Sequence, residues 1–169
     1  MSDVTLPSPA PTKPTLRFML SHPAHFISLG FGSGLAPFAP GTFGTLLGWF
    51  AAQWLQPLLG DETFFIGLAF ALGIGIWAAG VTGRALGESD HGSIVWDEVI
   101  AMALITALLP GAFWKQAVAF LLFRLLDIRK PGPIGWADRN VKGAFGVMLD
   151  DLIAAAITLF IVALWIRLL

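Results

Sequence analysis

The stretch "TFFIGLAFALGIGIWAAGVTG", residues 63–83, decides the fold class of this chain. It contains no charged residue. At about 1.5 Å per residue, a helix of this length crosses the roughly 30 Å hydrocarbon core of a bilayer. Its glycines also allow neighbouring helices to approach closely. The stretch therefore predicts a membrane-spanning helix.

The composition of the whole chain agrees with that prediction. The 169 residues are 56% hydrophobic and 12% charged, with a mean hydropathy of +0.78, whereas a soluble domain has about 25% charged residues. A formal net charge of -1 leaves no basic face for a nucleic-acid partner. The absence of cysteine excludes disulfides, thiolate metal sites and cysteine nucleophiles. The length is that of one helical domain.

Further apolar stretches on either side predict more helices. One covers residues 42–59, two shorter ones meet at Pro110 and Gly111, and the last covers residues 152–166. The segment 30–44 is too rich in glycine and proline for a regular spanning helix, so we expect it at the interface or folded back into protein. The predicted fold class is all-α, a small polytopic helical membrane protein with about four to five membrane helices.

The N-terminal end differs in composition from the rest. Residues 7–14, "PSPAPTKP", carry four prolines, which rule out a helix or a sheet ladder. We therefore predict a disordered, proline-rich arm over residues 1–20 and a single membrane domain over residues 21–169.

Positive charge predicts the orientation. Lysine and arginine concentrate on the cytoplasmic side of membrane proteins. The basic residues concerned are Lys13, Arg17, Arg84, Arg124, Arg129, Lys130, Arg139 and Lys142. They place three polar segments, 30–44, 84–98 and 124–151, on one cytoplasmic face, where we expect them to assemble a site.

Carboxylates on that face predict the chemistry of the site. Most of the eleven acidic residues lie between positions 88 and 151. Clustered carboxylates without cysteine suit a hard cation such as Mg²⁺, which takes oxygen ligands and keeps phosphate oxygens in its shell. Interleaved arginine and lysine side chains supply the charge that a phosphate monoester needs.

Simpler roles exist for each residue taken alone. Asp97 with Glu98, and Asp150 with Asp151, are also placed to complement the dipole at a helix N-terminus. An ion pair at i,i+3 spacing accounts for Arg124 and Asp127, and the loop cations also set topology. The non-enzymatic alternative is a small transporter or channel with interfacial carboxylates, because intramembrane acids often mark ion paths.

Three blocks of the sequence carry a family resemblance. They are "GFGSGLAPFAPGTFGTLLG" (30–48), "HGSIVWDEVIAM" (91–102) and "FRLLDIRKPGPIGWADRNVKGAFGVMLDDLIAA" (123–155). Together and in this order they resemble the phosphatidylglycerophosphatase A family of the bacterial inner membrane. The resemblance implies a multi-pass lipid phosphatase whose active site faces the cytoplasm. It also implies Mg²⁺-dependent hydrolysis of phosphatidylglycerophosphate to phosphatidylglycerol and inorganic phosphate.

The residues and the resemblance together give a site hypothesis. The predicted metal ligands are Asp97, Glu98, Asp127, Asp150 and Asp151, and the predicted phosphate-binding residues are Arg124, Lys130, Arg139 and Lys142. Asp138 is predicted to orient a ligand or to accept a proton. The haloacid-dehalogenase signature D-x-D-x-[TV] is absent, which favours attack by a metal-bound water over an aspartyl-phosphate intermediate.

Overall fold

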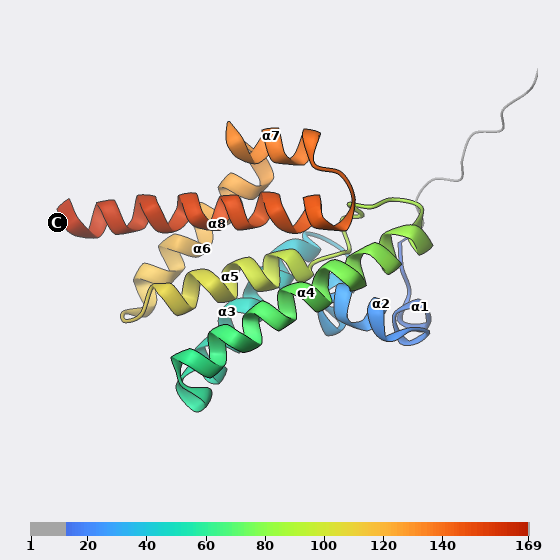
Figure 1. The fold of residues 1–169 in the computed structure, drawn as a ribbon, viewed down its shortest axis with the longest axis horizontal. Helices are drawn as coiled ribbons and strands as arrows, with labels where there is room; N and C mark the ends of the chain where they lie inside the picture. The colour runs from blue at the N-terminus through green and yellow to red at the C-terminus, as the bar shows by residue number, and fades with distance from the viewer. Residues whose placement is uncertain (1–12, 169) are drawn as a thin grey trace, which may run out of the picture.

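The computed structural model describes residues 13–168, and that part of the chain consists of helices and connecting turns (Figure 1). The elements in chain order are α1 (Leu16–Leu20), α2 (Pro23–Ser28), the 3-10 helix η1 (Gly30–Leu35), α3 (Pro40–Leu59), α4 (Asp61–Leu86), α5 (Trp96–Leu108), α6 (Phe113–Arg129), α7 (Pro133–Asn140) and α8 (Gly143–Leu168). The predicted all-α fold is confirmed.

Helix α5 forms the centre of the bundle. It contacts α3, α4, α6 and α8, and most of its side chains are buried. Met102 and Ile105 pack with Phe123 of α6 and Ile134 of α7 in one apolar cluster. With 13 residues α5 is about 20 Å long, shorter than the hydrocarbon core of a bilayer. Apolar packing along the rest of α5 therefore holds its acidic N-terminal turn in place.

Glycines on α3 allow this helix to lie directly against α5. A Cβ atom added at Gly44 would lie 2.8 Å from Cβ of Val95, and one at Gly48 would lie 2.9 Å from Cα of Val99. Small residues at such spacing bring two helix backbones together. The N-terminal turn of α3 is thereby placed next to the N-terminal turn of α5.

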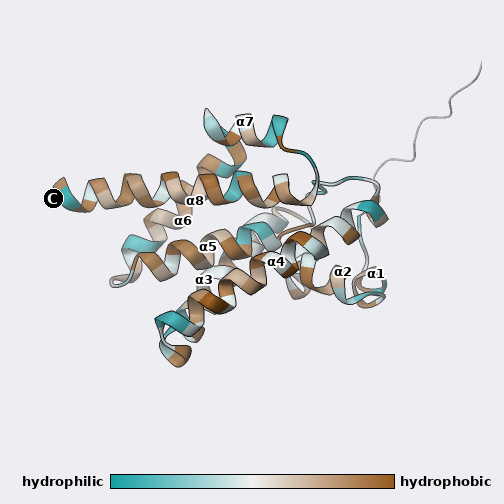
Figure 2. Ribbon diagram, viewed as in Figure 1, coloured by the Kyte–Doolittle hydropathy of each residue, from teal (hydrophilic) through white to brown (hydrophobic). Residues whose placement is uncertain are grey.

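Two helices are long and apolar enough to cross a membrane. They are α4 and α8, each of 26 residues, and both are largely apolar along their length (Figure 2). Phe70 of α4 and Phe160 of α8 are each 70% exposed, as expected of helices that face lipid rather than water. The total of four to five membrane helices stays a prediction.

The N-terminal region differs in part from the prediction. Residues 16–20, at the end of the predicted disordered arm, form α1, whose first turn is capped by the Thr15 hydroxyl. Residues 1–12 lie outside the described residues. In the segment 30–44, Phe31 and Gly32 have positive φ angles and Gly30 and Gly34 are buried, which fits the second of the two expected placements, folded back into protein. Residues 40–44 differ from the expectation, because they begin the regular helix α3.

The start of the last helix corrects a second prediction. Helix α8 begins at Gly143 rather than at residue 152, and its first turn contains no acidic residue. Asp150 and Asp151 lie about two turns inside it, where the charge at a helix N-terminus has fallen off. The dipole explanation is therefore wrong for these two aspartates.

Candidate active site

Three carboxylates converge at the junction of α5 and α8. Asp97 and Glu98 lie in the first turn of α5, and Asp151 reaches them from α8. One oxygen of each lies within 4.8 Å of the others. Asp97 is 7% exposed and Asp151 is 3% exposed. We call Asp97, Glu98 and Asp151 the carboxylate triad.

The triad has oxygen atoms without partners. Oε2 of Glu98 and Oδ2 of Asp151 are buried and accept no hydrogen bond, whereas Oδ1 of Asp97 accepts one from the backbone N–H of Glu98 at 3.1 Å. Buried carboxylates that are close together and unpartnered are costly unless a cation neutralises them. Their oxygen donors fit Mg²⁺, so the triad is a suitable metal site.

Arg124 of α6 is the cation beside the triad. Its Nη1 atom lies 3.3 Å from Oε1 of Glu98 and 2.6 Å from Oδ2 of Asp127, and Thr45 lies 3.5 Å away. Asp127 also lies next to Asp151. Two carboxylates, Glu98 and Asp127, therefore share the Arg124 guanidinium, and the predicted i,i+3 ion pair between Arg124 and Asp127 is confirmed.

Gly41, in the first turn of α3, is a site residue that we did not single out from the sequence. A Cβ atom at this position would overlap Oε1 of Glu98 and would lie 2.9 Å from Nη2 of Arg124. Only glycine leaves room for this ion pair. The available signal was the segment "APGTFG" (39–44), whose glycines stand at the start of a predicted helix.

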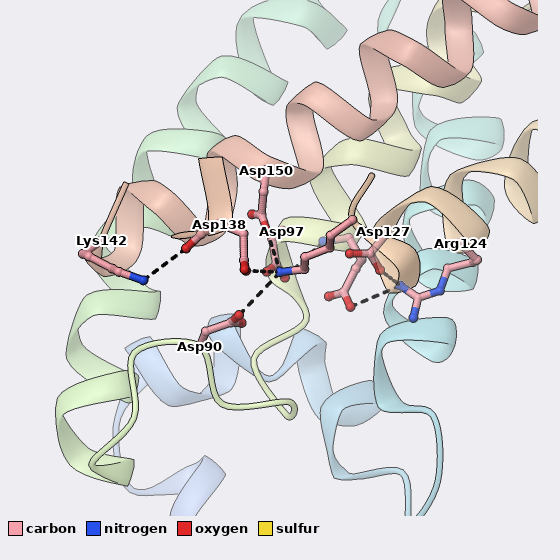
Figure 3. A network of polar contacts seen from close by, with 9 residues as sticks. Asp90, Asp97, Arg124, Asp127, Asp138, Lys142 and Asp150 are labelled. Carbon is pink, nitrogen blue, oxygen red and sulfur yellow. Dashed lines mark hydrogen bonds and ion pairs between the residues drawn. The ribbon is translucent and has the colours of Figure 1, made fainter. Parts of the chain in front are cut away.

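A second charged group is centred on Lys130, and Figure 3 shows its carboxylates Asp90, Asp138 and Asp150 close to Asp97. The ammonium lies 2.6 Å from Oδ2 of Asp150 and 3.7 Å from Oδ2 of Asp90, and it also pairs with Asp138. Lys130 ends α6 in a left-handed conformation, with φ 43°. Burial lowers its pKa, but hydrogen bonds to Asp138 and Asp150 outweigh that effect and raise the pKa of Lys130 above that of an ordinary lysine.

The partners of Lys130 modify two predicted roles. Its ammonium is already engaged by protein carboxylates, so it is not a free phosphate ligand in this structure. The carboxylate of Asp138 is likewise held by Lys130. Oδ1 of Asp150 is buried and has no hydrogen-bond partner. Asp90 had not been assigned a role, although it lies in the polar loop 84–98 that we had placed on the same face.

A small cavity opens beside the Lys130 group. Its volume is about 150 Å³, and its lining includes Asp90, Asp138, Lys142 and Asp150. Lys142 is exposed and donates a hydrogen bond to the backbone carbonyl of Asp138 at 3.3 Å. Its ammonium makes no ion pair within residues 13–168. Lys142 is therefore the cation of this cavity that is available to an anion.

The structure gathers most of the predicted site residues. The triad, Arg124 and Asp127 form one group, and Lys130, Asp138, Asp150 and Lys142 form the adjoining one. Asp150 and Asp151, consecutive on α8, connect the two groups. Arg139 is exposed on α7 and makes no ion pair in the described part of the chain, so it is the predicted residue that joins neither group.

Comparisons with known proteins match this chain to a family. The family model for phosphatidylglycerophosphatase A matches residues 26–166. Phosphatidylglycerophosphatase A of Escherichia coli (strain K12) is 41% identical over 84% of this chain and 83% of its own length. The Haemophilus influenzae protein of the same name is 39% identical over 90% of this chain and 96% of its own length. No solved structure matches. The chain belongs to the phosphatidylglycerophosphatase A family.

Proposed function

We propose that this protein hydrolyses phosphatidylglycerophosphate to phosphatidylglycerol and inorganic phosphate. Two relatives at 39% and 41% identity are named as phosphatidylglycerophosphatases, and the matched residues include both charged groups of the site. The observation that carries the chemistry is the buried carboxylate triad with its unpartnered oxygens. Neither relative is named as a transporter, and no comparison favours that alternative.

The proposed cofactor is Mg²⁺. The ligands that fit it are Asp97, Glu98 and Asp151, with Asp127 and Asp150 placed next to them. When bound, Mg²⁺ supplies a Lewis acid for phosphate oxygens and lowers the pKa of a coordinated water. Oxygen donors with no nitrogen or sulfur ligand are the set that Mg²⁺ prefers.

The charged side chains of the chain divide the remaining work. Arg124 orients Glu98 and Asp127 at one edge of the triad, and Lys130 orients Asp150 at the other. At the rim of the cavity, Lys142 is placed to bind oxygens of the phosphate. Catalysis of phosphate-monoester hydrolysis rests on such positioning and charge neutralisation.

Hydrolysis also requires an acceptor for a proton. Water attacks the phosphorus atom, the bond from phosphorus to the glycerol oxygen breaks, and that oxygen takes up a proton. Oδ1 of Asp150 is buried without a partner and is available as acceptor for the proton of the water. Asp138, the acceptor predicted from sequence, and Asp150 both pair with Lys130, so it is the buried, unpartnered Oδ1 that makes Asp150 the better candidate.

The proposed location is the bacterial inner membrane, with several spans and the site facing the cytoplasm. Helices α4 and α8 are long enough to cross the bilayer. Lys130, Arg139 and Lys142 belong to the same polar region as the carboxylates, and positive charge of this kind concentrates on the cytoplasmic side. This orientation gives the site access to the phosphate of a lipid in the inner leaflet.

The test is a phosphate-release assay on the purified protein in detergent. Phosphatidylglycerophosphate is the substrate, with Mg²⁺ or with excess chelator, and other lipid phosphomonoesters measure specificity. We expect release with Mg²⁺ and loss of release in chelator that added Mg²⁺ restores. Equal release in chelator would refute the metal, and no release under any metal condition would refute the activity.

A further inference from the structure

An apolar groove lies between α3, α4 and α5. Its volume is about 350 Å³, and its walls include Leu47, Leu55 and Leu59 of α3, Phe64 and Leu68 of α4, and Ile100 of α5. No charged residue lines it. The groove is partly open at the surface of the bundle, so a ligand can enter it from the side.

The groove has the length and direction of a lipid chain. On α3 it extends from Leu47 to Leu59, which at about 1.5 Å per residue is about 18 Å. Helix α4, which supplies a second wall, is one of the two candidate membrane spans. The groove thus follows α3 away from the helix end that carries Gly41, beside Glu98, and toward the opposite end of the bundle.

One end of the groove lies at the start of α5, where the lining residues Trp96 and Val99 flank Asp97 and Glu98 in the chain. Trp96 lines the groove and directly precedes Asp97, so the two side chains leave α5 about 100° apart. The indole N–H of Trp96 donates to the carbonyl of Ala71 at 3.0 Å. The ring of Phe31 stands edge-on to the indole, with centroids 5.3 Å apart. Trp96 is therefore fixed at the boundary between charged site and apolar groove.

We infer that this groove binds one acyl chain of the phospholipid substrate while the phosphate lies at the triad. The inference rests on the proposed function, because it assigns a subsite for the same lipid. A ligand with a charged head and a hydrocarbon tail matches a charged site and an uncharged groove that both border the N-terminal turn of α5. Burying each methylene contributes about 0.8 kcal/mol, so the groove adds affinity for a long chain and fixes the position of the head group.

Gly67 of α4 provides a direct way to fill the groove. It lines the groove, and a Cβ atom at this position would meet nothing within 4 Å. Gly73 lies on the same helix, is equally open, and belongs to a different surface with Phe70 and Trp77. Gly67→Phe and Gly73→Phe are therefore a matched pair that adds the same side chain inside and outside the groove.

The first experiment uses a phospholipid whose acyl chain carries a photoreactive diazirine, incorporated into nanodiscs with the full-length protein. After irradiation, mass spectrometry maps the labelled residues. We expect wild-type protein and Gly73→Phe to be labelled at groove residues such as Leu55 and Leu68. In Gly67→Phe, the labelling yield at these residues should fall at least about tenfold. Equal labelling in all three proteins, or labelling confined to outward residues such as Phe70, would overturn the inference.

The second experiment compares a long-chain with a short-chain phosphatidylglycerophosphate. We expect the ratio of kcat/KM values, long over short, to fall about tenfold or more in Gly67→Phe and to stay at the wild-type value in Gly73→Phe. An unchanged ratio in Gly67→Phe would refute the subsite. Size-exclusion profiles and unfolding temperatures establish that both variants fold. Photolabelling needs no turnover, so failure of the proposed activity and failure of the groove are distinguishable.

Discussion

Asp97, Glu98 and Asp151 are unusual as individual residues because Asp97 and Asp151 are buried and Glu98 is partly buried. Their oxygens lie within 4.8 Å of one another, and the one guanidinium in contact with the triad in the described residues is shared between Glu98 and Asp127. Buried like charges destabilise a fold unless something neutralises them. The triad is therefore costly to the fold unless a cation binds there, which is the role proposed for Mg²⁺.

Glu98→Gln tests this explanation against the alternative of helix-dipole stabilisation. We expect phosphate release to fall by more than about 100-fold, because loss of a ligand exceeds the 10–100-fold effect of outer-shell changes. Glu62→Gln is the matched control, since Glu62 is also a glutamate in the first turn of a helix but is exposed. Activity assays and calorimetric titration with Mg²⁺ measure both variants. Near-equal activities would restore the dipole explanation.

Gly41→Ala tests the close approach of α3 to the site. The added methyl overlaps Glu98 and crowds Arg124, so we expect lower turnover and weaker Mg²⁺ binding while the protein still folds. The control is Gly73→Ala, whose methyl enters open space on α4. Turnover and unfolding temperature are measured for both. Full activity in Gly41→Ala would show that the Glu98–Arg124 pair has no role in catalysis.

At the scale of elements, Lys130 connects three segments of the chain. Lys130 follows the last residue of α6, and its ammonium pairs with Asp138 of α7 and Asp150 of α8. Asp90, in the loop between α4 and α5, lies nearby. Helix α7 is short, with 8 residues, and such helices depend on tertiary contacts for their stability. Lys130 therefore both fixes α7 on α8 and orients the carboxylate of Asp150.

Lys130→Met is expected to loosen α7 and to reduce activity. The substitution removes the ammonium and leaves Asp138 and Asp150 facing each other as like charges. Hydrogen–deuterium exchange should increase in residues 133–140, and phosphate release should fall at least about tenfold. Arg129→Met is the control, because Arg129 is the exposed neighbour in the last turn of α6. Unchanged exchange in Lys130→Met would contradict this assignment.

The raised pKa of Lys130 also predicts a pH dependence of stability. The folded-state pKa of Lys130 lies above the unfolded value of about 10.4. The ion pairs of Lys130 therefore contribute their full amount to the free energy of unfolding below that pH, and this contribution is lost as pH rises through the folded-state pKa. We expect the difference in unfolding temperature between wild type and Lys130→Met to be constant from about pH 6 to 9. It should shrink above about pH 10.4. A difference that vanishes near neutral pH would contradict the ion-pair assignment.

For the whole molecule, the question is how the bundle sits in the bilayer. Helix α4 has 26 residues, or about 39 Å, and it exposes large apolar side chains such as Ile66, Phe70 and Trp77. Its C-terminal end leads into the loop that carries Asp90. The carboxylate site and the C-terminal end of α4 must therefore face the same side of the membrane.

Single cysteines at the two ends of α4 test this orientation, and the chain has no cysteine of its own. Glu62→Cys and Glu88→Cys replace two exposed glutamates at opposite ends of the helix. With a membrane-impermeant thiol reagent on intact cells, we expect labelling of Glu62→Cys, and of Glu88→Cys only after permeabilisation. The reverse pattern would place the site outside the cytoplasm.

The helical class can be predicted from the sequence alone, and so can the residue types of the candidate site. Uncharged stretches such as 63–83 predict long apolar helices, because backbone polar groups in lipid must be satisfied within the helix. Carboxylates without cysteine predicted oxygen ligands, and Asp97 and Glu98, adjacent in the chain, were predicted together. These properties follow from residue type and local spacing.

Only the tertiary structure decided which charges meet. Asp151 joins Asp97 because α5 and α8 pack together, and Gly41 reaches Glu98 because glycines bring α3 against α5. Lys130 was predicted to bind phosphate, but the folded chain pairs it with Asp138 and Asp150. Helical periodicity fixes neighbours three or four residues apart. Contacts between distant helices depend instead on how their surfaces pack, which local sequence does not specify.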